Sequence, residues 1–598
     1  MAQIDPWDFV GFTIICYIHD MKNSVSQRIL ALLFLISISL AIVPLEKPAN
    51  GAWREPVRGL HAMVVSQHEL ASKIGVEVLK KGGNAVDAAI AVGLALAVVY
   101  PEAGNLGGGG FMLIRMKNGD THAIDYREMA PKTATRNVFV DKEGKLIRGE
   151  GSSTIGYRAS GVPGTLAGFD MAFNKYGSGR LKWQELVEPA RQLAQNGYEL
   201  SYRLAELFKT YQRNLSKYED SKKIFLNGGK YYGEGDTFRQ PDLAQTLQRV
   251  ETQGAREFYT GKTAQLIAAD MKAHDGLITL EDLQNYRPKE RTALRGSYRG
   301  YEIITMPPPS SGGIVLLQVL NMLEGYDIRS MQYNSAAKYH VLVEAFRRSF
   351  ADRAEFMGDP DFADVPVVTL VDKNYAAQRR STIELTKASQ SSSIGHGEII
   401  GREPTETTHF TVVDSDGNVV TNTYTINDLY GSAVTAKGTG VLLNDEMDDF
   451  AAQPGRPNMF GLIQGEKNAV QGEKRPLSSM TPTIVLKKDG TLWFALGARG
   501  GPRIITAVIQ SVINVIDHDM DIQQAIDAPR IHHQWFPDEV VFEPFGMSPD
   551  TSNILKEYGH VFADKPSYIA SATGIMVGKD GARLGAIDSR SDGAAVGY

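Results

Sequence analysis

Alternation of hydrophobic and polar residues around short turns is the clearest pattern in this chain, and it predicts four β-hairpins. Each turn holds Asn-Gly or Asp-Gly between two runs of β-forming residues, the strongest local signal for a hairpin. The four segments are residues 111–126, 407–425, 482–496 and 573–587. Antiparallel sheets with helices packed outside them are the expected architecture.

Helical patterns lie between these hairpins. Residues 84–100 begin with the capping residue Asn84 and end before Pro101, and their uncharged part is too short to cross a bilayer. This segment predicts a helix that is buried on most sides. Segments 181–193 and 242–250 carry charged and amide residues at helical spacing, which predicts helices facing solvent.

Two glycine clusters, residues 107–110 and Gly500-Gly501, fall beside the predicted hairpins. A glycine run can bind an anion through backbone N–H groups, but neither cluster completes a phosphate-loop or dinucleotide-binding pattern. Tight turns are therefore the expected structure at both places.

Composition narrows the class of protein. A chain of 598 residues allows two to four domain-sized units, and 43% hydrophobic with 22% charged residues is typical of a folded protein. The net charge of -6 argues against nucleic acid as a partner. Because Cys16 is the only cysteine, the chain has no internal disulfide and no cysteine-based metal site.

The N-terminal region resembles an export signal. Lys22 and Arg28 precede an uncharged run at 29–43, which is short for a membrane span and suits the core of a signal peptide. Met21 is a natural start for it, so residues 1–20 are either an upstream extension or a misassigned start, and 21–52 form the signal region. We expect a periplasmic or secreted protein; an uncleaved membrane anchor is the alternative.

The hairpin at 407–425 is rich in threonine. Threonine is β-branched and fits a strand, so this composition alone requires no function. If Val413 pairs with Val419, Thr407 lies opposite Thr425, whereas a shift of one residue places Ile426 there. A cut before Thr407 would free an α-amine with an ordinary pKa of about 7.7 to 8.0, able to accept the proton of the Thr407 hydroxyl.

Ordered motifs in the chain closely resemble the γ-glutamyltranspeptidase family from about residue 54 to the C-terminus. They are residues 108–113, 125–131, 307–313, 407–414, 444–450, 474–484, 500–505 and 531–535. The resemblance implies an α+β fold of the N-terminal-nucleophile hydrolase type, with two antiparallel sheets between helical layers in the order αββα. It also implies that the chain cuts itself between Glu406 and Thr407 into a large subunit, 53–406, and a small catalytic subunit, 407–598, which stay associated as a heterodimer and form one core.

The resemblance implies a role for each residue of the site. Thr407 is the nucleophile and Thr425 the residue that orients it, while the backbone N–H groups of Gly500 and Gly501 stabilise the oxyanion. The remaining matches are Arg127, Ser478 and Ser479 for the α-carboxylate of the substrate, and Asn427, Glu446 and Asp449 for its α-amine. Alone, each of these charged and hydroxyl residues fits a surface, turn or capping position; their joint order favours the site.

Glutathione and other γ-glutamyl compounds are the expected donors, with water, amino acids or dipeptides as acceptors and no cofactor. Residues 451–461 resemble a lid loop of bacterial relatives, where Phe460 replaces a frequent tyrosine. For the pair His532-His533 we favour an orienting role over metal binding, because no familiar ligand spacing surrounds it.

Two other functions remain open at this stage. A related acylase would act on glutaryl or cephalosporin side chains, which lack the α-amine; the matches at Asn427, Glu446 and Asp449 favour the transpeptidase. A non-catalytic exported binding protein would keep the fold without needing the hydroxyl of Thr407.

Overall fold

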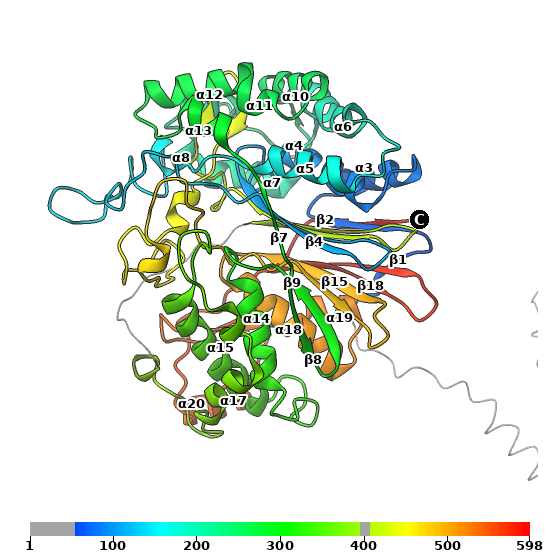
Figure 1. The fold of residues 1–598 in the computed structure, drawn as a ribbon, viewed down its shortest axis with the longest axis vertical. Helices are drawn as coiled ribbons and strands as arrows, with labels where there is room; N and C mark the ends of the chain where they lie inside the picture. Colours follow the sequence, from blue (N-terminus) through cyan, green and yellow to red (C-terminus); the bar gives the residue numbers. More distant parts are fainter. Residues whose placement is uncertain (1–53, 395–406) are drawn as a thin grey trace, which may run out of the picture. The chain divides into compact units, whose positions relative to one another are not determined.

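Two seven-stranded antiparallel sheets form the centre of the fold in a computed structural model that describes residues 54–394 and 407–598 (Figure 1). The first sheet has the strand order β1 (Val57–Gly59), β19 (Arg583–Ile587), β18 (Ser571–Val577), β15 (Leu492–Arg499), β14 (Thr483–Leu486), β9 (Tyr301–Thr305) and β8 (Leu294–Tyr298). The second has the order β20 (Ala594–Gly597), β2 (Met63–Ser66), β10 (Thr408–Val413), β11 (Val419–Thr425), β3 (Gly109–Arg115), β4 (Thr121–Asp125) and β7 (Lys289–Arg291). The expected signal region at 21–52, the extension at 1–20 and Glu406 lie outside the described residues.

Helices cover the outer faces of both sheets, and Figure 1 shows the resulting four layers, helix, sheet, sheet, helix. On the second sheet lie α3 (Glu69–Lys80), α4 (Ala85–Val99), α5 (Thr165–Tyr176), α6 (Trp183–Asn196), α7 (Tyr202–Thr210), α8 (Gln212–Leu215), α10 (Pro241–Gln253), α11 (Glu257–Thr260), α12 (Lys262–Ala273) and α13 (Leu280–Asn285). On the first sheet lie α14 (Gly312–Leu323), α15 (Ala336–Phe356), α17 (Lys373–Ser381), α18 (Arg503–His518), α19 (Ile522–Asp527) and α20 (Pro549–Glu557). The predicted αββα order is confirmed.

Shorter elements complete the chain. They are the helices α9 (Glu219–Phe225) and α16 (Val367–Leu370), the strand pairs β5 (Tyr198–Glu199) with β6 (Thr237–Phe238), β12 (Thr435–Ala436) with β13 (Val441–Leu442) and β16 (Ile531–His532) with β17 (Val541–Phe542), and 3-10 turns at Tyr157–Ala159, Asn227–Gly229, Ser391–Ser393, Glu446–Asp449 and Glu466–Asn468. None of the helices in the described ranges is long and apolar enough to span a bilayer.

All four predicted hairpins are present, as β3–β4, β10–β11, β14–β15 and β18–β19. In the second of them Val413 pairs with Val419 and Thr408 with Tyr424, which is the register that places Thr407 beside Thr425. Of the two registers left open by the sequence, the structure has the first, closed by a five-residue loop, 414–418. The β14–β15 ladder differs by a register shift between Val485 and Leu486.

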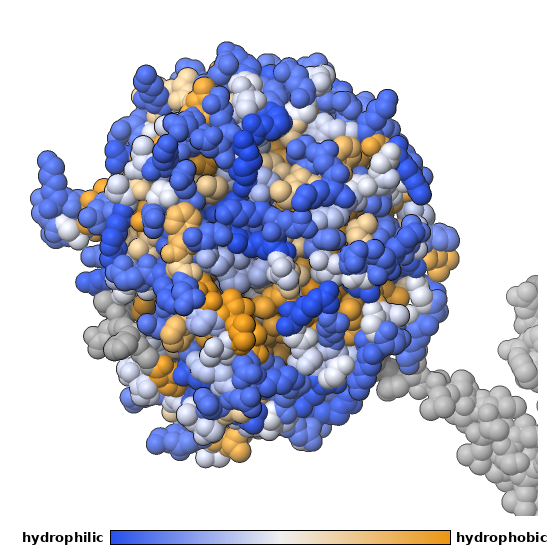
Figure 2. Space-filling model, viewed as in Figure 1, coloured by the Kyte–Doolittle hydropathy of each residue, from blue (hydrophilic) through white to orange (hydrophobic). Residues whose placement is uncertain are grey.

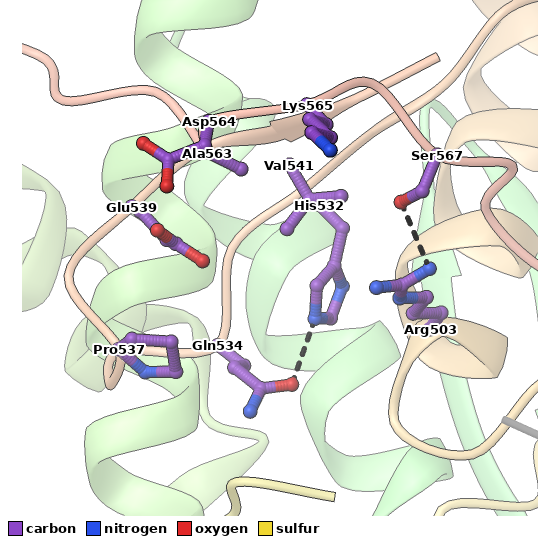
Figure 3. Close-up of a pocket in the computed structure, with 10 residues that line it drawn as sticks. All are labelled: Arg503, His532, Gln534, Pro537, Glu539, Val541, Ala563, Asp564, Lys565 and Ser567. Atoms are coloured by element: carbon purple, nitrogen blue, oxygen red, sulfur yellow. Dashed lines mark hydrogen bonds between the residues drawn. The ribbon is translucent and has the colours of Figure 1, made fainter. Parts of the chain in front are cut away.

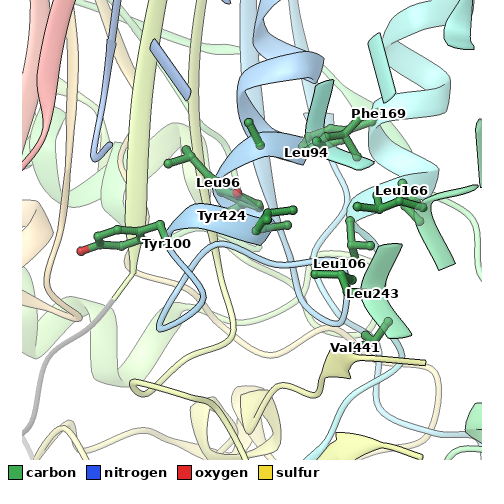
Figure 4. Packing of buried hydrophobic residues seen from close by; sticks show 14 of the residues in the cluster. Leu94, Leu96, Tyr100, Leu106, Leu166, Phe169, Leu243, Tyr424 and Val441 are labelled. Atoms are coloured by element: carbon green, nitrogen blue, oxygen red, sulfur yellow. The ribbon is translucent and has the colours of Figure 1, made fainter. Parts of the chain in front are cut away.

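The predicted buried helix is α4. The Asn84 side chain accepts hydrogen bonds from the backbone N–H groups of Val86 and Asp87, while Asp87 caps the Asn84 N–H in return. Every residue of α4 is buried, and Figure 4 shows its Leu94 and Leu96 within the apolar cluster that includes Phe169 and Tyr424 of neighbouring elements. Burial on all sides explains why the sequence shows no polar stripe here.

The prediction of a tight turn at residues 107–110 is wrong. Gly109 and Gly110 begin strand β3 and pair with Thr425 and Tyr424. A Cβ atom at Gly108 would lie 2.0 Å from the carbonyl oxygen of Thr425, so the glycine permits the close approach of two backbones. By contrast Gly500 and Gly501, with φ values of 132° and 54°, form the expected turn before α18.

Figure 2 shows one face of the molecule, on which hydrophobic side chains gather in a band at the level of the sheets while the helical layers present mainly hydrophilic ones. This distribution agrees with a core that lies between and beside the sheets. Its two large clusters are centred on α4 and on the helices α14, α15 and α18.

Candidate active site

Two threonine hydroxyls meet at one end of the central strands β10 and β11. Thr407 Oγ1 lies 3.4 Å from Thr425 Oγ1, and both residues are buried. The backbone N–H of Asn427 donates a hydrogen bond of 2.8 Å to Thr425 Oγ1. This bond uses an acceptor position of the Thr425 hydroxyl, so the O–H proton of Thr425 remains available to Thr407.

Arg127 follows strand β4 and is fully buried. Its guanidinium forms ion pairs with Glu446 and Asp449, and its Nε donates to the carbonyl oxygen of Pro476 at 3.3 Å. Burial disfavours the charge, but the carboxylates of Glu446 and Asp449 outweigh this and raise the pKa of Arg127 above its ordinary value. A planar fork of this kind is suited to a carboxylate ligand.

Glu128 is a third acid of this cluster, and the sequence analysis missed it. Its side chain is fully buried, with Oε2 3.5 Å from Arg127 Nη1. Burial raises the pKa of Glu128 to about 7, opposed by the charge of Arg127, and burial likewise raises the pKa of Glu446. The only signal available in the sequence was its place next to Arg127 in the motif 125–131.

The replacement Glu128→Gln should make stability less dependent on pH. Because the pKa of Glu128 rises from 4.5 to about 7 on folding, the folded chain binds more protons than the unfolded chain in this window, and wild-type stability falls as the pH rises through it. Glutamine does not ionise. The free energy of unfolding of the Glu128→Gln variant should therefore rise, relative to that of the wild type, by about 1 to 3 kcal/mol from pH 5 to pH 8.

Denaturant unfolding at the two pH values measures this difference. Glu281→Gln, a change at an exposed carboxylate paired with Lys132, is the control and should show no comparable growth. If the difference in free energy of unfolding between wild type and Glu128→Gln stays constant across this pH range, the raised pKa of Glu128 is contradicted.

The predicted substrate residues line one cavity with the threonine pair. Its walls are Arg127, Thr407, Thr425, Asn427, Glu446, Asp449, Phe460, Ser478, Ser479, Met480, Gly501, Pro502 and Ile504. The volume of this cavity is about 20 Å³, which is too small for a group of amino-acid size, so side chains of its wall have to move before a substrate binds.

The turn before α18 forms part of the wall of this cavity, through Gly501 and Pro502. Phe460 packs against Gly501, where an added Cβ would lie 3.2 Å from the ring. An aromatic cover is thus present at the position that the sequence analysis assigned to the lid loop. The left-handed φ of Gly501 and the adjacent Gly500 leave the backbone open to close approach by a reacting group.

A second pocket, of about 330 Å³, contains His532, Gln534 and Arg503 (Figure 3). The two ring nitrogens of His532 bond to Thr506 Oγ1 and Gln534 Oε1, both at 2.9 Å, and Gln534 Nε2 donates to the carbonyl oxygen of Phe460. His533 bonds instead to Asp538 at 3.2 Å. The histidines thus belong to separate networks, and in the described part of the chain no cluster of three or more His, Cys, Asp or Glu residues could hold a metal ion.

This arrangement has the elements of acyl transfer: a hydroxyl with a hydroxyl neighbour, glycine N–H groups beside it, and opposite charges a short distance away. The structure brings together nine of the predicted site residues in the cavity wall, and Gly500 directly precedes Gly501. Glu406 lies outside the described residues.

Comparison with known proteins identifies the relatives of this chain. A family model described as gamma-glutamyltranspeptidase matches residues 71–598. The glutathione hydrolase proenzyme of Escherichia coli (strain K12) is 47% identical over 576 residues, which cover 95% of this chain and 98% of that protein.

Solved structures agree with this result. The crystal structure of cephalosporin acylase from Bacillus halodurans matches with a TM-score of 0.81 at 26% identity, covering 93% of this chain and 99% of that one. The gamma-glutamyltranspeptidase of Helicobacter pylori is 49% identical with a TM-score of 0.54, covering 55% of this chain and 93% of that one. The chain therefore belongs to the γ-glutamyltranspeptidase family of N-terminal-nucleophile hydrolases.

Proposed function

We propose that this protein is a γ-glutamyltransferase and glutathione hydrolase that acts through Thr407. The observation that carries the proposal is the shared cavity, whose wall contains both a buried arginine with two carboxylate partners and the Thr407–Thr425 hydroxyl pair. Membership of the family supports the same reaction.

Charge recognition follows from the ion pairs of Arg127. A γ-glutamyl group carries an α-carboxylate and an α-ammonium on one carbon. Its carboxylate binds the guanidinium of Arg127 and the hydroxyls of Ser478 and Ser479. Glu446 and Asp449 are thereby released from Arg127, and they bind the ammonium together with Asn427. The substrate thereby replaces one set of charge pairs by another, and no buried charge is left without a partner.

Catalysis begins when the α-amine of Thr407, freed by self-cleavage after Glu406, accepts the hydroxyl proton. Thr407 Oγ1 attacks the γ-carbonyl carbon, and the backbone N–H groups of Gly500 and Gly501 hold the resulting oxyanion. The carbon–nitrogen bond breaks, the leaving amine takes the proton, and a γ-glutamyl ester remains on Thr407. Water, or the amine of an amino acid or dipeptide, then attacks the ester and restores the hydroxyl.

The same proposal extends to processing and location. The large and small subunits stay associated because strands β10 and β11 of the small subunit pair with β2 and β3 of the large one. Glutathione is the expected donor, in line with the name of the Escherichia coli relative. The protein is exported in this proposal, and the support for export is the signal-like sequence of residues 21–52.

Turnover of two matched anilides tests the proposal. The processed protein should release nitroaniline from γ-glutamyl-p-nitroanilide at least about a hundredfold faster, as kcat/KM, than from glutaryl-p-nitroanilide, because only the first offers an ammonium to the acids of the cavity. The likeness to a cephalosporin acylase makes a glutaryl-type acylase the second candidate. Equal rates on both anilides would remove the argument from amine recognition, and faster turnover of the glutaryl anilide would favour the acylase function.

A further inference from the structure

The motif 307–313 supports the serine pair of the active site. Ser478 donates its backbone N–H to the carbonyl oxygen of Pro309 at 2.9 Å, and its own carbonyl oxygen accepts from both the N–H and the hydroxyl of Ser311, at 2.8 and 2.7 Å. Ser310 Oγ donates to the carbonyl oxygen of Met480 at 2.5 Å. The loop between β9 and α14 thus fixes the backbone on both sides of Ser479.

Arg353 of helix α15 supports this loop from behind. Its Nε donates to Ser311 Oγ at 2.9 Å, and its side chain is fully buried. Nη1 has no hydrogen-bond partner within the described residues, nor does any carboxylate there lie at ion-pair distance from this side chain. On the same helix Arg347 and Arg348 both pair with Glu344. Arg353 therefore differs from these two arginines in being a buried cation without a carboxylate partner among the described residues, and packing alone does not explain such a residue.

We propose that Arg353 is a positioning residue for the α-carboxylate of γ-glutamyl substrates: it fixes Ser478 through Ser311 and supplies a second buried positive charge behind the serine pair. This inference rests on the proposed function, because it concerns the carboxylate subsite of that same cavity.

The charges of the cavity agree with this role. Burial lowers the pKa of Arg353 to about 10, opposed by the carboxylate of Asp449, so Arg353 is charged at neutral pH and lies within the electrostatic reach of the site. When the substrate carboxylate binds Arg127, Asp449 pairs with the substrate ammonium instead. A carboxylate held by serine hydroxyls is then stabilised by a fixed cation behind them, which involves no reorganisation on binding.

Kinetics on three anilides test the role of Arg353, since two of the substrates carry the carboxylate that it is proposed to serve and the third lacks it. γ-Glutamyl-p-nitroanilide has both charged groups, glutaryl-p-nitroanilide lacks the amine, and 4-aminobutyryl-p-nitroanilide lacks the carboxylate. Arg353→Met should lower kcat/KM for the first two by about tenfold to a hundredfold, mainly through KM, and leave the third within about twofold. Arg353→Lys keeps the charge and should lose less.

Matched variants separate this role from general damage. Arg348→Met removes another buried arginine of α15 and should affect all three substrates alike. If Arg353→Met fails to fold or process, Arg353→Lys and Ser311→Ala carry the same test, with expected losses of about three- to tenfold confined to the carboxylate-bearing substrates. Where turnover of an analogue is too slow to measure, inhibition by glutaramate, which keeps the carboxylate, and by 4-aminobutyramide, which lacks it, replaces turnover.

Two outcomes would overturn the inference: an equal loss on all three substrates, or no loss on any. Both would leave the proposed function intact, since wild-type turnover of γ-glutamyl-p-nitroanilide is measured in the same experiment. Absence of that wild-type turnover would overturn the proposed function itself.

Discussion

Thr407→Ala should yield an uncut chain with no measurable turnover. The wild-type protein should separate into two species, one of which has the mass of the 192 residues from Thr407 to Tyr598. The hydroxyl of Thr407 is needed twice, first to attack the peptide bond before it and then to attack the substrate. Loss of such a nucleophile lowers kcat by about 10⁴-fold or more. Intact-mass spectrometry and anilide turnover together measure both effects.

Two variants serve as controls for Thr407→Ala. Thr407→Ser keeps the nucleophile and should still cleave itself and turn over substrate. Thr408→Ala removes the neighbouring hydroxyl, which is fully buried and has no hydrogen-bond partner within the described residues, and should be processed normally. A wild-type chain that stays whole would contradict the nucleophile assignment and favour a binding role. An active, processed Thr407→Ala variant would contradict it as well.

Local sequence was sufficient to predict the hairpins and to limit the partner of Thr407 to Thr425 or Ile426. The Asp416-Gly417 turn located the hairpin but left two registers open; in the structure residues 414–418 form the loop, and every further pair along the ladder follows from the Val413–Val419 pair. The 3.4 Å approach of Thr407 and Thr425 is a direct consequence of the Val413–Val419 pair. The same local reasoning failed at residues 107–110, because the glycines there serve a close approach to Thr425, a contact that only the folded sheet creates.

The charged part of the site was beyond local reasoning. Arg127 and its partners Glu446 and Asp449 are separated by more than 300 residues, and only the family resemblance joined them. Glu128 and Arg353 were missed because a charged residue in a sequence is most simply read as a surface residue. Their burial becomes visible only when strand β4 and helix α15 are placed around the cavity.

Arg127→Met should abolish recognition of γ-glutamyl substrates and destabilise the fold as well. The variant loses the fork that binds the α-carboxylate, and kcat/KM for γ-glutamyl-p-nitroanilide should fall by about 10³-fold or more. It also leaves the carboxylates of Glu128, Glu446 and Asp449 without their cation, and removing one partner of a buried ion pair typically costs about 3 to 5 kcal/mol. Steady-state kinetics and denaturant unfolding measure the two losses separately.

A double variant distinguishes recognition from stability. In Arg127→Met/Glu446→Gln one buried carboxylate is gone together with the cation, so much of the lost stability should return. Activity should not return, because neither methionine nor glutamine offers a positive charge to the α-carboxylate. If the double variant regained turnover along with its stability, Arg127 would serve only to hold the fold, and the carboxylate would have to bind elsewhere.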